Sequence, residues 1–93
     1  MELEKDEVIL WKRGANLKIK CLKISGTLFI TNRKIIFKPF LSKKELKIGL
    51  NEIKKVEIIK GFIKRMKIIA GKKEYIFFTK NVIDVAHLIK SLS

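Results

Sequence analysis

The sequence predicts a mainly β protein, in which about seven short antiparallel strands form a barrel or sandwich and one C-terminal α-helix caps it. Apolar residues recur at every second position through most of the 93 residues, which is the period of half-buried strands. Only the last segment changes to the spacing of a helix. The chain is 47% hydrophobic, which is enough for a compact core, and we assign residues 1–93 to a single domain.

The predicted strands can be followed by their alternating residues. Leu17, Ile19 and Cys21 alternate with lysines, and two later segments repeat the pattern. Between Cys21 and Leu22 the alternation slips by one position, which predicts a turn or bulge within residues 19–24. Turn-forming residues separate the apolar runs, at Gly14, Ser25-Gly26, Thr31-Asn32, Pro39, Asn51, Gly61 and Gly71.

The segment "NVIDVAHLIKSLS" predicts one amphipathic helix over about residues 81–92. We expect Asn81 to be its N-cap, and Asp84 lies in the first turn, where the helix dipole favours an acid. A meander of this size leaves the ends of its core open, so we expect the helix to cover one end. Its apolar stripe consists of Val82, Val85, Ala86, Ile89 and Leu92.

The stretch "GTLFITNRKIIF" resembles the glycine, strand, Thr-Asn, basic, strand pattern of GRAM domains and their bacterial PH-like relatives. The segments "EVILWKRGANL", "LKIGLNEIKKVE" and "KKEYIFFT" are similar to further family segments in the same order, so the resemblance covers roughly residues 7–92. It implies a PH-like fold, a seven-stranded barrel or sandwich capped by a helix. It also implies a binding role toward phosphoinositides, other anionic lipid head groups or proteins.

The charge of the chain limits the classes of partner that it can bind. Lysine and arginine number 22 against nine acids, a net charge of +13, and four of the acids lie within residues 1–7. We expect residues 1–6 to be flexible. A basic domain of this kind favours nucleic acid, a membrane surface or an acidic protein. The alternative is that the abundant lysine and isoleucine reflect the composition of the host's proteins, without selection for binding.

Several classes of function are disfavoured by the residues that the chain lacks. No apolar run reaches the length of a membrane-spanning helix, and the acidic start is unlike a secretory signal, so we expect a cytoplasmic protein, peripheral at the membrane. Cys21 is the single cysteine and His87 the single histidine, so we expect no disulfide, metal site or cofactor. We interpret Cys21 as a small buried residue and His87 as a surface residue, which leaves no catalytic group and predicts a non-enzyme.

Strand parity predicts where the loops lie. If the strands form a simple meander, the connections after the first, third and fifth strands share one end of the fold, and these read "KIKCLKIS", "KPFLSKKE" and "KGFIKR". Each combines basic with large apolar residues. The opposite connections "TNRK", "LNE" and "AGKK" have no large apolar tip, so parity places Lys72 and Lys73 at the far end.

We therefore predict a basic and apolar loop surface that binds anionic lipid head groups at the membrane interface. The alternative is that Phe40 and Phe62 fold back over the mouth of the barrel. The predicted ligand-binding residues are Lys18, Lys20, Lys23, Lys38, Lys43, Lys44, Lys64 and Arg65. The predicted membrane or partner contacts are Phe40, Leu41, Phe62 and Ile63.

Two other functions share this surface. A protein-interaction or oligomerisation module, including a homo-oligomer, would use an apolar patch or an edge strand. Trp11 is a candidate for such a contact, or packs beneath the helix. Non-specific nucleic-acid binding ranks lower, because the chain has only three arginines and its strand lysines lack interleaved aromatic residues.

Overall fold

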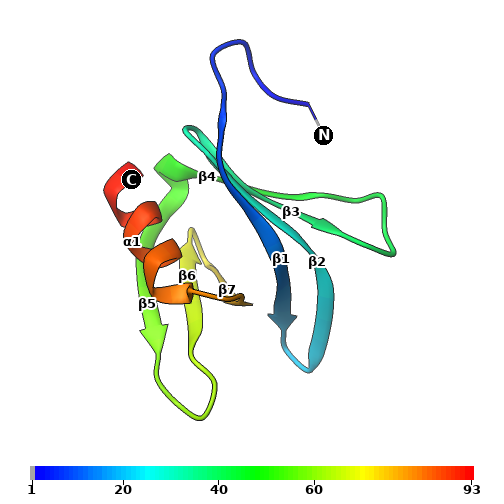
Figure 1. Ribbon diagram of the computed structural model, residues 1–93, viewed down its shortest axis with the longest axis vertical. Helices are drawn as coiled ribbons and strands as arrows, with labels where there is room; N and C mark the ends of the chain where they lie inside the picture. The colour runs from blue at the N-terminus through cyan, green and yellow to red at the C-terminus, as the bar shows by residue number, and fades with distance from the viewer. Residues whose placement is uncertain (1) are drawn as a thin grey trace.

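The computed structural model describes residues 2–93, which form seven strands and one α-helix (Figure 1). The strands are β1 (Ile9–Ile19), β2 (Leu22–Thr31), β3 (Lys34–Pro39), β4 (Leu46–Gly49), β5 (Ile53–Ile59), β6 (Arg65–Ala70) and β7 (Lys73–Phe78). A 3-10 turn (Leu50–Glu52) joins β4 to β5, and α1 (Val82–Leu92) follows β7. The prediction of seven strands followed by one helix is confirmed.

All neighbouring strands are antiparallel, in the order β4-β3-β2-β1-β7-β6-β5. The central strand β1 pairs with β2 along its whole length but with β7 only at residues 16–18. The sheet therefore opens into two splayed halves, with α1 beside β5 and β6 (Figure 1). It is not closed into a barrel, because β4 is only four residues long and the 3-10 turn leads the chain away before β4 and β5 pair. Of the two predicted forms, the sandwich fits.

The core lies between the two halves of the sheet and α1. Its fully buried members come from both halves, and α1 adds Val82, Val85, Ala86 and Ile89. These are the predicted stripe residues, except that Leu92 is only partly buried. Asn81 occupies the N-cap position in a left-handed conformation, with φ of 58°, but its side chain caps no backbone group. Trp11 packs against the core.

The β1–β2 connection is a two-residue turn. Ile19 pairs with Leu22, so Lys20 and Cys21 form its tip, and Lys20 has a φ of 54°. The predicted turn within residues 19–24 is confirmed. The interpretation of Cys21 as a buried residue is wrong, because a side chain at the tip of a two-residue turn has no sheet surface beneath it and is exposed.

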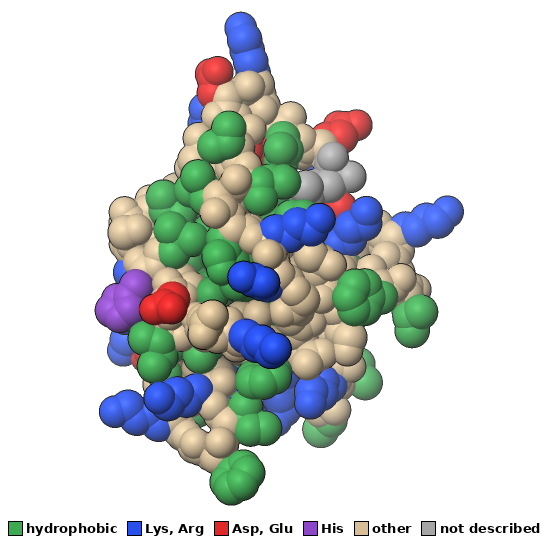
Figure 2. Space-filling model, viewed as in Figure 1, with side chains coloured by type: hydrophobic (Ala, Val, Ile, Leu, Met, Phe, Trp, Pro, Cys, Tyr) green, Lys and Arg blue, Asp and Glu red, His purple; other side chains and the backbone are tan. Residues whose placement is uncertain are grey.

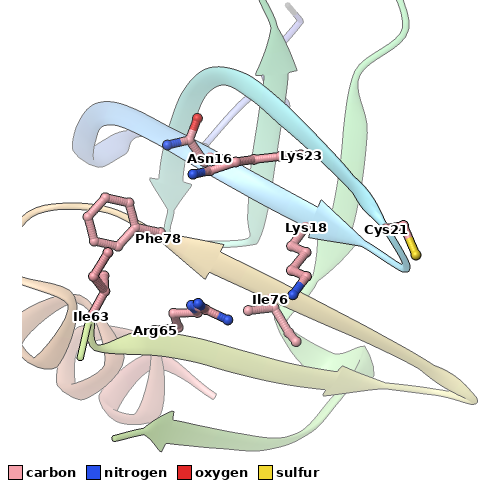
Figure 3. A pocket seen from close by; sticks show the side chains of 8 residues that line it. All are labelled: Asn16, Lys18, Cys21, Lys23, Ile63, Arg65, Ile76 and Phe78. Carbon is pink, nitrogen blue, oxygen red and sulfur yellow. The ribbon is translucent and has the colours of Figure 1, made fainter. Parts of the chain in front are cut away.

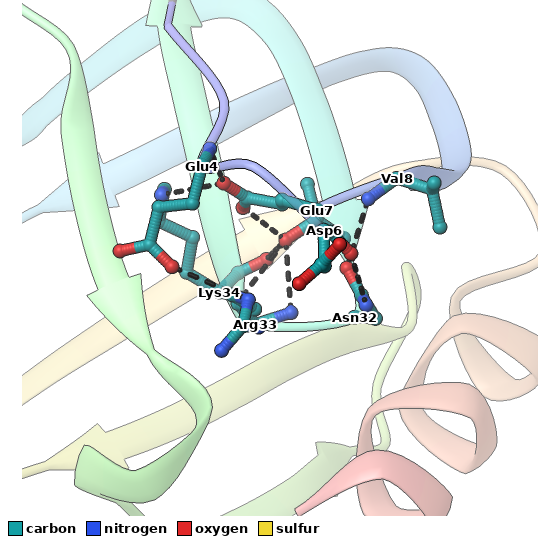
Figure 4. A network of polar contacts seen from close by, with 8 residues as sticks. Glu4, Asp6, Glu7, Val8, Asn32, Arg33 and Lys34 are labelled. Carbon is teal, nitrogen blue, oxygen red and sulfur yellow. Dashed lines mark hydrogen bonds and ion pairs between the residues drawn. The ribbon is translucent and has the colours of Figure 1, made fainter.

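Glu7 ties the N-terminal segment to the β2–β3 turn (Figure 4). Its buried carboxylate accepts hydrogen bonds from the Thr31 hydroxyl and from Lys34 Nζ, the latter at 2.8 Å. The Asn32 side chain accepts from the Val8 amide and donates to the Asp6 carbonyl. The Thr-Asn-basic turn thus holds the N-terminal segment against the sheet, and the charge of Lys34 is already neutralised there.

Gly26 allows close approach of β2 and β3, where it pairs with Pro39. A Cβ atom at Gly26 would lie 2.4 Å from the Lys38 carbonyl oxygen and 2.8 Å from a Phe37 ring carbon. We expect Gly26→Ala to lower the free energy of unfolding by about 1–3 kcal/mol, because backbone atoms must shift to admit the methyl group. Chemical denaturation measures this change.

Gly14→Ala is the matched control, because the nearest atom to its Cβ, the Gly26 carbonyl oxygen, is 4.0 Å away. We expect this variant to be as stable as the original chain or slightly more stable. Equal destabilisation of the two variants would contradict the close approach at Gly26.

Candidate functional site

A groove of about 280 Å³ lies on the outer face of the sheet, where β2, β1, β7 and β6 run side by side (Figure 3). Its lining comes from these four strands, the β1–β2 turn and the β5–β6 loop. The lining residues are Asn16, Lys18, Cys21, Lys23, Ile63, Arg65, Ile76 and Phe78.

Strand alternation places these side chains on one face. Leu17 and Phe77 are buried and point into the core, so their neighbours on β1 and β7 point outward. The pairing of β1 with β7 sets Asn16 opposite Phe78 and Lys18 opposite Ile76. The groove therefore depends on the register between two strands that lie far apart in the sequence.

The groove has an apolar floor and a basic rim. Lys18 and Arg65 approach each other from β1 and β6, next to Ile76, while Ile63 and Phe78 lie together at one end (Figure 3). Such a site suits a compact anion that also carries apolar or neutral parts.

The basic residues of the rim are not neutralised by the protein. Lys18 lies directly opposite Lys23 on the neighbouring strand, an arrangement of like charges that destabilises a sheet by about 0.2–1 kcal/mol. In residues 2–93, neither these two lysines nor Arg65 forms an ion pair, whereas the bases Arg33, Lys34, Lys55 and Lys67 do. A bound anion would relieve the repulsion between the lysines of the rim.

The apolar loop residues are strongly exposed. Phe40 is 67% exposed and Phe62 107%, and their neighbours Leu41 and Ile63 are exposed as well. The alternative in which the two phenylalanines cover the mouth of the fold is therefore wrong. The β3–β4 and β5–β6 loops carry them past the ends of their strands, and Figure 2 shows hydrophobic side chains that project from the surface near Lys and Arg side chains.

The predicted site residues fall into separate places. Lys18, Lys23, Ile63 and Arg65 line the outer-face groove. Phe62 and Lys64 lie beside the start of α1, and Lys20 lines a second groove, which shares Lys18 and Ile76 with the first. β6 runs parallel to β1, so the β1–β2 turn with Cys21 and the β5–β6 loop with Ile63 lie at opposite ends of the groove (Figure 3), and the β3–β4 loop projects sideways (Figure 1). The end of β3 and this third loop carry Lys38, Phe40, Leu41, Lys43 and Lys44.

Strand parity mispredicts the ends at which both the β5–β6 loop and the β6–β7 turn lie. The second groove brings Lys73 together with Lys20 and Leu46, because β7 runs antiparallel to β1 and begins at the end where β1 finishes. A simple meander would have made β1 and β7 parallel. Because β4 and β5 do not pair, β5 need not run antiparallel to β4, and the strands that follow run opposite to the directions of a simple meander. Lys72 and Lys73 therefore do not lie at the far end.

Asn16, Cys21, Ile76 and Phe78 line the groove but are not among the predicted site residues. The run "YIFF" of β7 carries a signal for the last two, because consecutive apolar residues indicate a strand covered on both faces. Asn16 carries no such signal, since its position follows only from the β1–β7 register. Its side-chain oxygen accepts a hydrogen bond of 2.7 Å from the Ser25 hydroxyl.

Two solved structures share this arrangement of strands and helix. The Vps36 N-terminal PH domain superposes with a TM-score of 0.80 at 17% identity, over 98% of this chain and 82% of its own. The fold is PH-like. The C-terminal domain of an unknown protein from Leishmania infantum gives a TM-score of 0.82 at 16% identity, over 92% and 84% of the two chains.

The sequence comparisons add no family to this PH-like fold. No protein-family model and no curated protein sequence matches the chain. The two solved structures confirm the PH-like part of the resemblance, and the narrower similarity to GRAM domains stays a prediction. Within residues 2–93, no helix is long and apolar enough to cross a membrane.

Proposed function

We propose that this PH-like chain is a non-enzymatic binding module that attaches to anionic lipid surfaces from the cytoplasmic side. The observation that carries the proposal is the outer-face groove, in which Lys18, Lys23 and Arg65 surround an apolar floor without a counter-charge in the described chain. The cross-strand lysine pair costs stability, and an anionic head group would supply the missing negative charge.

The exposed apolar loops support a membrane surface as the source of that anion. Ile63 stands at one end of the groove, Phe62 precedes it in the β5–β6 loop, and Phe40 and Leu41 extend from the β3–β4 loop. Aromatic and branched side chains of this kind enter the head-group layer, while each lysine near an anionic surface contributes about 1 kcal/mol. The two contributions respond differently to salt.

Lys23→Glu tests the groove. The change turns a like-charge pair with Lys18 into an opposite-charge pair, so we expect the free energy of unfolding to rise by about 0.2–1 kcal/mol. Two units of charge are lost from the rim, so we expect affinity for vesicles of phosphatidylserine and phosphatidylcholine to fall about thirtyfold. Co-sedimentation at about 0.15 M salt measures the affinity, where distant charges are screened.

Lys5→Glu is the matched control, because it makes the same charge change in the N-terminal segment, away from the β1–β2 turn (Figure 1). We expect this variant to keep most of its vesicle binding. Equal losses in the two variants would show that binding follows net charge alone and would overturn the groove as the site. Failure of the original chain to bind anionic vesicles would overturn the function.

The loop residues are tested in the same assay over a salt titration. Replacing Phe40 and Phe62 together with serine should weaken vesicle binding at high salt as well as at low salt, because apolar insertion is lost and the charge remains. Replacing Lys43 and Lys44 with glutamate should weaken it mainly at low salt, where screening is least. Vesicle binding that is unchanged in the phenylalanine variant would contradict insertion of the loops.

A further inference from the structure

The strand β5 forms one edge of the sheet and is hydrogen-bonded only to β6. In the described residues 2–93, no strand covers its outer edge. The other exposed edges are less suited to pairing. β4 has only four residues, and the uncovered first part of β1 contains a register shift between Ile9 and Trp11. On β5 the register shift lies before Lys55, so its remaining five residues form a regular edge, from Lys55 to Ile59.

The pairing pattern shows which backbone groups of β5 point toward this edge. Ala70 and Lys73 flank the two-residue turn between β6 and β7, so they form a hydrogen-bonded pair, and alternate residues of β6 then bond to β5. The β5 residues opposite these alternate β6 residues are Lys55 and Glu57, so their backbone N–H and C=O groups point toward β6. The N–H and C=O groups of the residue between them, Val56, therefore point to the free edge, as do those of Ile58.

The charges of β5 are complementary to a second copy of the same strand. In an antiparallel pair about a two-fold axis at Val56, Lys55 of one copy lies opposite Glu57 of the other, and the reverse pair forms by symmetry. These positions are non-hydrogen-bonded pairs, in which side chains approach most closely. Registers centred on Lys54 or Ile58 form no such pairs, and registers centred on Lys55 or Glu57 set like charges opposite each other, so the charges select one register.

We propose that two copies of this chain pair through β5, in the register centred on Val56, to form one continuous antiparallel sheet. Within one copy, Lys55 Nζ already lies 2.8 Å from a Glu57 carboxylate oxygen on the outer face. Pairing brings two such ion pairs together, with each charge next to two of the opposite sign. The symmetry axis is perpendicular to the sheet, so the outer faces of both copies are on the same side.

This arrangement has a consequence that rests on the proposed function. The outer-face grooves of the two copies would face one membrane together, and two linked sites bind such a surface far more tightly than one. Dimer formation itself does not require lipid, so it can be tested with the protein alone.

The test uses Lys55→Glu and Glu57→Lys, measured by sedimentation velocity at about 0.15 M salt. The original chain should form a dimer of twice its 10.8 kDa mass as its concentration rises. Each variant alone replaces two opposite-charge pairs with two like-charge pairs, so its dimer affinity should fall about tenfold or more. An equal mixture of the two variants restores opposite charges across the interface and should restore the dimer.

The mixture distinguishes pairing between copies from effects within one copy. Each variant has lost its internal ion pair, alone and in the mixture, so a dimer restored in the mixture must come from contacts between copies. Glu74→Lys is the matched control: it makes the same charge change as Glu57→Lys and removes a surface ion pair with Lys67, but it lies on β7. It should dimerise like the original chain. An original chain that stays monomeric at every concentration, or a mixture no more dimeric than its components, would overturn the proposal. Vesicle binding by a monomeric chain would overturn the dimer alone and leave the proposed function standing.

Discussion

Deletion of residues 81–93 is expected to abolish the cooperative unfolding transition of the chain. The deletion removes α1, whose side chains Val82, Val85 and Ile89 are buried against β5 and β6. Each large apolar side chain contributes about 1.5–3 kcal/mol when fully buried, so the helix accounts for a substantial part of the 5–15 kcal/mol that stabilises an ordinary domain. Thermal denaturation followed by circular dichroism measures the transition.

Two point variants show whether the buried stripe is responsible. Ile89 is fully buried and Ile83 is 39% exposed on the same helix. Ile89→Ser should lower the melting temperature strongly, and Ile83→Ser should change it little. A truncated chain that melts in an unchanged cooperative transition would contradict the role of α1 in the core.

Glu7→Ala is expected to lower the free energy of unfolding by about 3–5 kcal/mol, because it leaves the Lys34 ammonium without its partner. The Lys34 side chain is only 15% exposed, and Thr31 is fully buried beside it. Chemical denaturation at neutral pH measures the loss. Glu4→Ala is the control: its ion pair with Arg33 is solvent-exposed and should contribute about 1 kcal/mol or less. A Glu7 variant no less stable than the Glu4 variant would contradict the stabilising role of the Glu7 contacts with Lys34 and Thr31.

The same carboxylate should make stability depend on pH. Burial alone would raise the pKa of Glu7, but the hydrogen bonds from Lys34 and Thr31 outweigh it and lower the pKa from 4.5 to about 2. A carboxylate with a lowered pKa stabilises the fold above about pH 4.5, and this contribution is lost as the pH falls toward 2. The free energy of unfolding should therefore fall less steeply over this range in Glu7→Ala than in the original chain. Parallel curves would contradict the assignment.

The local elements of this fold are predictable because they are encoded by neighbouring residues. Alternation along β1, β4 and β6 reports which face of each strand is buried, and the stripe of α1 reports its core-facing side. The turn at Lys20 and Cys21 is visible as a slip in the same alternation. Exposure of Phe40 and Phe62 also agrees with their position in loops between predicted strands.

The candidate groove could not be predicted in the same way, because it depends on which distant strands pair. Alternation identifies Lys18 and Ile76 as outward-facing but does not place them on adjacent strands. The unpaired step from β4 to β5 leaves no mark in the alternation, and it determines that β7 runs antiparallel to β1. The misplacement of Lys72 and Lys73 has the same cause.

Binding of anionic lipid in the outer-face groove is tested most directly by the alkylation rate of Cys21. This residue is the only cysteine of the chain, it is exposed, and it lines the groove. With an uncharged reagent such as iodoacetamide, vesicles containing phosphatidylserine should slow the alkylation of Cys21, and vesicles of phosphatidylcholine alone should not. The Lys23→Glu variant should lose this protection. An alkylation rate that anionic vesicles leave unchanged, under conditions in which they sediment the protein, would contradict the groove as the lipid site.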